Sequence, residues 1–106
     1  MNLLSRAEEI ILVAVLHLKE SAYGVSIQDF ILEKTGREWS FAQIYDPLNK
    51  LVRKGFLQKT KGAPTPRRGG RHKCLYEITS GGRAALVEIR RTQDSIWAVI
   101  RKESLI

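Results

Sequence analysis

The residues able to do chemistry in this chain are mainly cations, and they are concentrated in one segment. Between Ser40 and Tyr76, nine lysines and arginines stand against one acid, Asp46, which is a net charge of +8 in a chain whose total formal charge is +7. A basic segment beside a near-neutral remainder indicates a surface that binds a polyanion, because a solubilising surface would mix both signs. A solvated basic loop without a partner is the alternative that charge alone leaves open.

No group of residues has the types and spacing that catalysis or metal binding requires. There is no Ser/His/Asp order and no carboxylate pair, and Gly69-Gly70 is typical of a hairpin tip rather than a phosphate loop. His72 and Cys74 lie two residues apart, but His17 is the only other histidine, and a closed zinc site needs about four ligands. We therefore expect no enzymatic activity, no metal and no cofactor.

The basic segment opens with a predicted third helix over about 40–54. Ser40 can cap this helix and Gly55 can end it. Phe41, Ile44, Leu48, Leu51 and Val52 recur on one face, which we expect to be buried. The other residues include short hydrogen-bonding groups and cations, the types that read base edges and hold phosphates, so we assign DNA contacts to Ser40, Gln43, Tyr45, Asn49, Lys50 and Arg53.

Two strand-like segments follow, over 56–60 and 73–78. The residues between them, 61–72, are too rich in glycine and proline for regular structure. Two strands joined by a basic tip form a β-ribbon wing, here over about 56–78. We expect the wing to contact the DNA backbone or the minor groove through Lys61, Arg67, Arg68, Arg71 and Lys73.

The remaining residues predict three more helices. Ser5 and Glu8 form a capping box for a helix over 6–19, Ser21 can cap a second helix to about Thr35, and Thr79 can cap a last helix to about Glu103. Three helices, a hairpin and a final helix define a mainly α winged helix-turn-helix domain over 1–79 with a C-terminal dimerisation helix over 80–106. In this architecture the third helix enters the major groove. The expected core is Ile11, Ile27, Ile44, Leu48, Leu51 and Tyr76.

The last helix carries an apolar stripe with a spacing of three to four residues. A helix of about 23 residues is about 35 Å long and must project beyond the body, and an exposed apolar stripe calls for a partner. We predict a homodimer, in which twofold symmetry doubles the DNA footprint. The alternative is a helix that folds back on its own first helix. Trp97 could also line a pocket for a planar ligand, although a seam anchor is the commoner role. The predicted interface is Leu86, Ile89, Gln93, Ile96, Trp97 and Ile100.

Several strings together resemble the PadR family of transcriptional regulators. They are Ala22-Tyr23-Gly24, the segment SFAQIYDPLNKLVRKGFL over 40–57, and Gly69-Gly70-Arg71-His72-Lys73 followed by Tyr76-Glu77-Ile78-Thr79. The resemblance implies a homodimeric winged-helix repressor with a short C-terminal helix, and it adds Tyr23 to the DNA contacts. Members often respond to phenolic, drug-like or other small ligands. One departure is Asp46, which separates Tyr45 from Pro47.

The resulting prediction is a cytoplasmic, dimeric and sequence-specific DNA-binding regulator. Its partners would be a palindromic operator and an effector of small aromatic or drug-like type, and repression is the expected mode. The longest apolar run, seven residues over 10–16, is too short to span a membrane. The alternative is a winged-helix module for protein or RNA contact, which would have no need of Gln43, Asn49, Lys50 and Arg53 on one helix.

Overall fold

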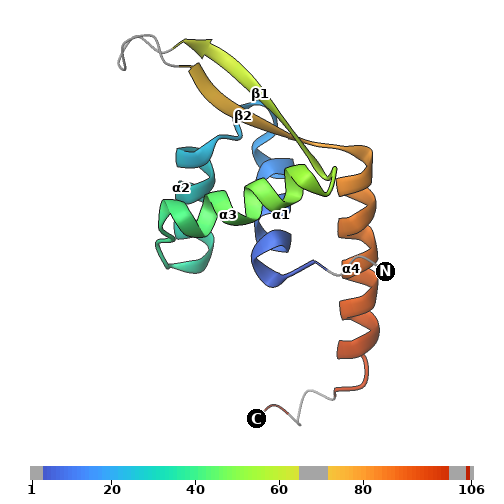
Figure 1. The fold of residues 1–106 in the computed structure, drawn as a ribbon. Coiled ribbons are helices and arrows are strands. Elements are labelled where there is room, and N and C mark those ends of the chain that lie inside the picture. Colours follow the sequence, from blue (N-terminus) through green and yellow to red (C-terminus); the bar gives the residue numbers. More distant parts are fainter. Residues whose placement is uncertain (1–3, 65–71, 101–104, 106) are drawn as a thin grey trace.

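The structure is a computed structural model of the 106-residue chain, and it describes residues 4–64, 72–100 and 105. Three helices form the body, a hairpin extends from one end of it, and a fourth helix runs along its side (Figure 1). The elements in order are α1 (Arg6–Leu18), the 3₁₀ turn η1 (Lys19–Ser21), α2 (Gly24–Thr35), α3 (Phe41–Arg53), β1 (Leu57–Pro64), β2 (His72–Ile78) and α4 (Ser80–Trp97).

Local capping fixes the starts of α1 and α3 as the sequence predicts. The Ser5 hydroxyl accepts from the Glu8 N–H at 3.1 Å, and a Glu8 carboxylate oxygen accepts from the Ser5 N–H at 2.8 Å. Ser40 and Gln43 repeat this reciprocal arrangement at α3. Each box satisfies amide groups that have no partner inside the helix. At the other end of α3, Gly55 takes a φ of 80°, which a residue without a Cβ adopts at little cost.

The start of α2 differs from the prediction. The chain forms the η1 turn over 19–21, and α2 begins only at Gly24, so Ser21 is not its cap. The N-cap residue is Tyr23, which makes no side-chain cap hydrogen bond. The hydroxyl of Ser26, in the first turn, accepts from the Tyr23 N–H at 3.0 Å and donates to the Ser21 carbonyl at 2.6 Å, so it ties the chain before the helix to its first turn.

The hairpin strands are longer than predicted. β1 continues through 61–64 and β2 already includes His72, so those residues are regular structure, contrary to the expectation for 61–72. The strands pair antiparallel from Leu57 with Ile78 to Lys61 with Cys74. The next pair is Pro64 with His72, so two residues of β1 oppose one of β2, which is a β-bulge. Proline is tolerated there because it ends an edge strand.

The core lies between α1, α2, α3 and the base of the hairpin. Of the six predicted core residues, the five aliphatic ones have no exposed surface and Tyr76 is 2% exposed, which confirms the prediction. Phe41 does not join them: it is 50% exposed, so its predicted place on the buried face of α3 is wrong.

The last helix starts as predicted and ends earlier. The Thr79 hydroxyl accepts from the Gly82 N–H at 3.0 Å and so caps α4. The helix ends at Trp97 rather than near Glu103, and its 18 residues correspond to about 27 Å. Within the described residues, no helix combines the length and the apolar character needed to cross a membrane.

Candidate nucleic-acid interface

The outward face of α3, with its cap residue, carries six of the twelve predicted DNA contacts. Ile44, Pro47, Leu48 and Leu51 are buried against the body. The helix is therefore strongly two-sided, and one turn after another presents polar side chains to solvent. The exposed predicted residues on this helix and its cap are Ser40, Gln43, Tyr45, Asn49, Lys50 and Arg53.

Two amides on this face are in different states. The Gln43 side-chain oxygen accepts from the Ser40 N–H at 2.8 Å, so it is oriented by the cap of its own helix. The side chain of Asn49 has no hydrogen bond to any of the described residues and is exposed. A bidentate contact to adenine needs both the oxygen and the nitrogen of an amide. Asn49 is therefore the freer candidate for reading a base, and Gln43 offers mainly its nitrogen.

An aromatic pair stands at the start of α3, and of its two residues only Tyr45 was predicted to contact DNA. Phe41 is 50% exposed, Tyr45 is 37% exposed, and their ring centroids lie 6.2 Å apart. Apolar contact with the thymine methyl is one way in which a major-groove helix reads sequence. The position of Phe41 directly after the cap residue Ser40 could have indicated its exposure, because the first residue of a helix is seldom covered by its own helix.

A close approach between α2 and α3 sets the place of Tyr45. A Cβ built on Gly24 would overlap the Tyr45 hydroxyl oxygen and lie 2.9 Å from its ring Cζ. Only glycine lets the tyrosine lie against the first turn of α2. The hydroxyl is thereby held beside the N-terminal end of α2, where unpaired N–H groups and the helix dipole favour an anion such as a phosphate.

The root of the wing is tied to the same region. The Tyr76 N–H donates to the Ala22 carbonyl at 2.9 Å, which joins β2 to the chain just before α2. The ammonium of Lys73 lies 4.3 Å from the centroid of the Tyr23 ring, a cation–π contact. Tyr23 and Lys73, predicted separately as DNA contacts, are therefore neighbours.

Burial, with smaller effects of Cys74 and Tyr45, raises the pKa of Tyr76 to about 12, so its phenol stays neutral.

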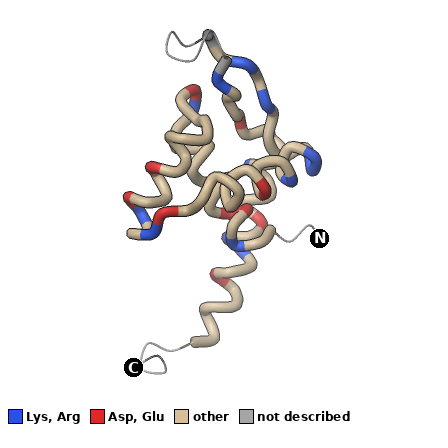
Figure 2. Tube along the Cα trace, turned by 60° about the vertical axis from the view of Figure 1, so that its left-hand side comes forward, with Lys and Arg blue, Asp and Glu red and all other residues tan. Residues whose placement is uncertain are grey.

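The described part of the wing carries exposed cations. Lys59 pairs with Tyr76 and Lys61 with Cys74, so both lysines lie on the hairpin face that packs onto the body at its base. Figure 2 shows basic residues along the hairpin. Lys59 was not among the predicted DNA contacts, although its charge and its place in the basic segment could have indicated it. The predicted contacts Arg67, Arg68 and Arg71 lie outside the described residues.

One lysine of the basic segment is used inside the protein. The Lys54 ammonium lies 2.7 Å from Oε2 of Glu8, whose side chain is 5% exposed. Burial alone would raise the pKa of Glu8, but the hydrogen bonds from Lys54 and Ser5 outweigh it and lower that pKa overall. This pair joins the start of α1 to the end of α3, and it leaves Lys50 and Arg53 as the cations of that helix end that form no ion pair with the described residues.

The predicted interface stripe on α4 divides into two halves. Leu86 and Ile89 pack partly against the protein's own core, and the Gln93 amide donates to Oε1 of Glu9 at 3.0 Å. The second half is uncovered: Ile96, Trp97 and Ile100 are 61%, 57% and 42% exposed. Figure 1 shows this end of α4 extending away from the three-helix body.

No metal site accompanies this interface in the described part of the chain. Within residues 4–64 and 72–100, no group of three or more histidine, cysteine or acidic side chains is placed to hold an ion. Cys74 is half-buried and is a free thiol. The arrangement offers amides, hydroxyls, aromatic rings and cations, which suit base edges and phosphates.

The fold and this surface define a winged-helix DNA-binding protein. The sequence profile of the transcriptional regulator PadR-like family matches residues 12–88, which is most of the chain. The chain therefore belongs to the PadR-like family, whose members are transcriptional regulators and not enzymes. This confirms the resemblance drawn from the residues. Among curated protein sequences, no significant match was found.

Solved structures share the same architecture. A transcriptional regulator from Clostridium thermocellum aligns over 88% of this chain and 84% of its own, with 20% identity and a TM-score of 0.70. A PadR family regulator from Clostridium difficile covers 90% and 94%, with 16% identity and a TM-score of 0.69. RosR from H. salinarum covers 92% and 81%, with 24% identity and a TM-score of 0.68. At these identities the likeness supports the fold.

Proposed function

We propose that this protein is a homodimeric, sequence-specific repressor that binds a palindromic operator in the cytoplasm. The observation that carries the proposal is the coincidence of charge and architecture. The basic third of the chain falls on α3 and the wing, which are the two elements that a winged helix applies to DNA. A protein- or RNA-contact module would not need exposed amides and cations together on the outward face of α3.

The parts of this surface have different tasks in the proposal. Asn49, Gln43 and Phe41 face base edges, whereas Lys50, Arg53 and the lysines of the wing bind phosphates. Tyr45, Tyr23 and Lys73 support one phosphate at the start of α2. Asp46 is exposed on the same helix and would repel phosphate unless it accepts from a cytosine amino group. Repression follows from occupation of the operator, which excludes other proteins from it.

The dimer in this proposal forms through the uncovered end of α4. Ile96, Trp97 and Ile100 present apolar surface that the protein's own body leaves exposed. In a twofold dimer each copy offers the same patch to its mate. Trp97 acts as the anchor of this seam. A planar aromatic effector stacked on Trp97 is a second use of the same surface, and quenching of indole fluorescence by such a ligand tests it.

The test is DNA selected by the protein from a random pool, followed by affinity measurements on single variants. We expect a palindromic consensus. Lys50→Ala and Arg53→Ala should each weaken binding to selected and random duplexes alike and lower the salt slope by about 0.9 for each phosphate that is no longer neutralised. Arg91→Ala, an exposed arginine on α4, is the matched control and should change nothing. No selected sequence, or equal effects of all three substitutions, would refute the proposal.

A further inference from the structure

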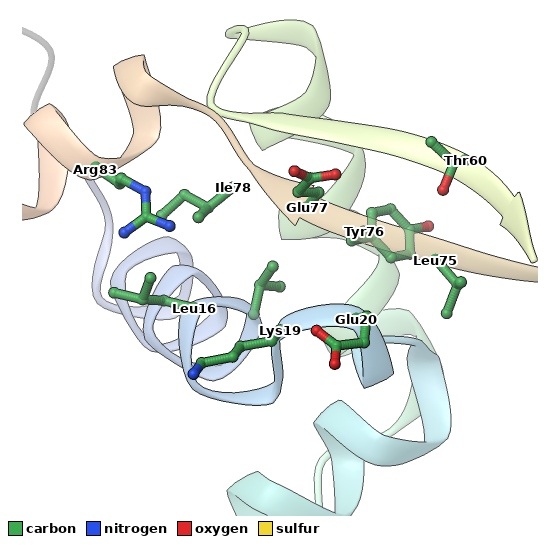
Figure 3. A pocket seen from close by; sticks show the side chains of 10 residues that line it. Leu16, Lys19, Glu20, Thr60, Leu75, Tyr76, Glu77, Ile78 and Arg83 are labelled. Atoms are coloured by element: carbon green, nitrogen blue, oxygen red, sulfur yellow. The ribbon is translucent and has the colours of Figure 1, made fainter.

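A cavity of about 310 Å³ lies at the root of the wing, and none of the residues that line it is among the proposed DNA contacts. The C-terminal end of α1 with η1, both hairpin strands, and the first turns of α4 enclose it (Figure 3). Its volume is at the lower end of the range of small-molecule sites, about 300–1,000 Å³. The cavity therefore has room for a small ligand but not for a peptide segment of any length.

The floor of the cavity is apolar. Val15 and Tyr76 are 1% and 2% exposed, and Leu16, Leu75 and Ile78 complete the lining around them. The Tyr76 phenol is neutral, as its pKa of about 12 indicates, so it adds no charge to this floor. An apolar frame of a ligand would gain free energy here by leaving water.

Four charged side chains surround this floor. Figure 3 shows Arg83 and Lys19 at one side of the cavity, and Glu20 and Glu77 nearer the middle of the hairpin. In the described part of the chain none of the four takes part in an ion pair, whereas four other ion pairs form elsewhere. Charges of both signs therefore stand without ion-pair partners around one apolar surface, with cations and acids on different sides.

The backbone of Lys19 adds a second observation at the same cavity. Its φ and ψ are 53° and −126°, and among the described residues it is the only one besides glycine with a positive φ. These angles match the first central position of a type II′ turn, which glycine normally occupies. A side chain kept at such a position costs free energy, and such strain is concentrated at functional sites. A lysine thus stands at a position where glycine would fit the backbone angles better.

We propose that this cavity binds a small zwitterionic molecule whose carboxylate and amine are separated by an apolar frame. The carboxylate would face Arg83 and Lys19, the ammonium would face Glu20 and Glu77, and the frame would cover Leu16, Tyr76 and Ile78. Binding to the protein alone does not depend on the proposed function.

A consequence for regulation does rest on the proposed function. The cavity and the DNA surface share the hydrogen bond from Tyr76 to Ala22, which ties the wing to the body. A ligand held between η1 and β2 would stabilise one position of the wing relative to α3. Affinity for DNA would then change with the ligand if DNA binds that position of the wing more or less tightly than other positions.

The first experiment measures ligand binding to the full chain without DNA, from amide resonances. The probes share one ring: para-(aminomethyl)benzoate, para-methylbenzoate and para-methylbenzylamine. We expect the zwitterion to bind most tightly and to shift the amides of residues 16–20, 75–78 and 83. Equal affinity of the three probes, shifts located near Trp97, or no binding of any probe would overturn the proposal.

Charge-neutral variants test the orientation. Arg83→Gln should weaken both carboxylate probes about fivefold, a value suited to exposed charges, and leave the amine probe unchanged. Glu77→Gln should weaken the two probes that carry an amine and leave para-methylbenzoate unchanged. Lys19→Gly should weaken the carboxylate probes without lowering the melting temperature, because glycine fits its backbone angles. Arg91→Gln and Glu88→Gln, exposed positions on α4 away from the cavity, are the matched controls. A uniform reduction in affinity for all probes would contradict the assigned orientation.

A last measurement compares affinity for the selected DNA with and without para-(aminomethyl)benzoate. The regulatory consequence is supported if the ligand changes the DNA affinity of the wild type and if this change is smaller in the Arg83→Gln variant. Resonance shifts without any change in DNA affinity would overturn that consequence and leave the binding site standing. Absence of DNA binding altogether would refute the proposed function, but the resonance shifts would still report on the cavity.

Discussion

Asn49 and Gln43 have the same functional group and lie on the same helix, yet their surroundings differ. The Gln43 oxygen is held by the Ser40 N–H, whereas the Asn49 side chain is free of other described residues. At the scale of single residues, the hydrogen bonds that a side chain already makes therefore say more about its freedom to contact a base than its chemical type does.

This difference yields a prediction on specificity. Asn49→Ala should reduce preference for the selected site by about 1–3 kcal/mol while binding to random duplex stays nearly constant. Gln43→Ala should reduce preference less, and it should lower the free energy of unfolding by about 1 kcal/mol because the hydrogen bond to Ser40 is removed. Gln43→Glu is the control, because it keeps the cap acceptor but adds a charge facing DNA. Titrations on both duplexes and thermal unfolding decide, and an equal reduction on both duplexes would contradict the role of Asn49.

The ion pair between Glu8 and Lys54 gives a prediction on pH. The pKa of Glu8 is lowered in the folded protein, so its stabilising effect is present above the unfolded value and is lost as pH falls through the folded value. Lys54→Met leaves a buried carboxylate without its cation, which should raise the pKa of Glu8 and cost about 1–3 kcal/mol at neutral pH. The measurement is the free energy of unfolding by denaturant between roughly pH 3 and pH 7, a range that spans the usual pKa of a glutamate.

The control for that experiment is Glu8→Gln, which removes the titrating group. Its stability should depend less on acid pH than that of the wild type. If Lys54→Met has the same acid dependence as the wild type, the pair contributes nothing to the pH dependence of stability.

At the scale of elements, we propose that the wing and α3 make different kinds of contact with DNA. The hairpin is held to the body at its root and continues beyond it by two paired strands with a bulge. In the proposed complex the cations of the wing bind phosphates, whereas Asn49 and Gln43 of α3 contact base edges. The wing should therefore contribute affinity that is independent of sequence.

Replacing Arg67, Arg68 and Arg71 together by alanine tests this division. Affinity should fall on every duplex, and the slope of log K against log salt should decrease by about 0.9 for each phosphate that the wing no longer neutralises. The ratio of specific to non-specific binding should stay the same. Arg90→Ala with Arg91→Ala, both exposed on α4, is the matched control. Unchanged affinity and salt slope in the triple variant would remove the wing from the interface.

For the whole molecule, α4 links the DNA-binding body to the proposed dimer. Leu86 and Ile89 pack on the core and Gln93 bonds to Glu9 of α1, whereas Ile96 and Trp97 beyond them are exposed. Interface variants must therefore be placed beyond Gln93, because changes at Leu86 or Ile89 would disturb the body itself.

Trp97→Ala with Ile100→Ala should convert the protein to a monomer at micromolar concentration. Truncation of a packed large apolar residue costs about 2–5 kcal/mol, and in a twofold interface each substitution acts on both copies. The body should stay folded, since its core lies in α1, α2, α3 and β2. Val87→Ala, exposed on α4 but outside the stripe, is the control. Sedimentation measures the outcome, and a stable dimer of the double variant would place the interface on another surface.

The sequence by itself determined the element order, most helix ends and the core. These features follow from local rules: the capping boxes at Ser5 and Ser40, the glycine after α3, and the 3.6-residue period of apolar residues. The same local composition separated the basic third of the chain from the rest. The family resemblance rests on such strings as well.

Tertiary structure decided which of these residues are free to act. Lys54 is taken by Glu8, 46 residues away, and Gln93 by Glu9, 84 residues away. In the first turn of α3, Phe41 is 50% exposed whereas Ile44 is fully buried, and α2 begins at Gly24, after the η1 turn, with the Ser26 hydroxyl bonded to the Tyr23 N–H. The cavity behind the wing likewise joins three distant segments. Such contacts depend on how the elements pack in space, and a local pattern of residue types does not encode which distant residues will meet.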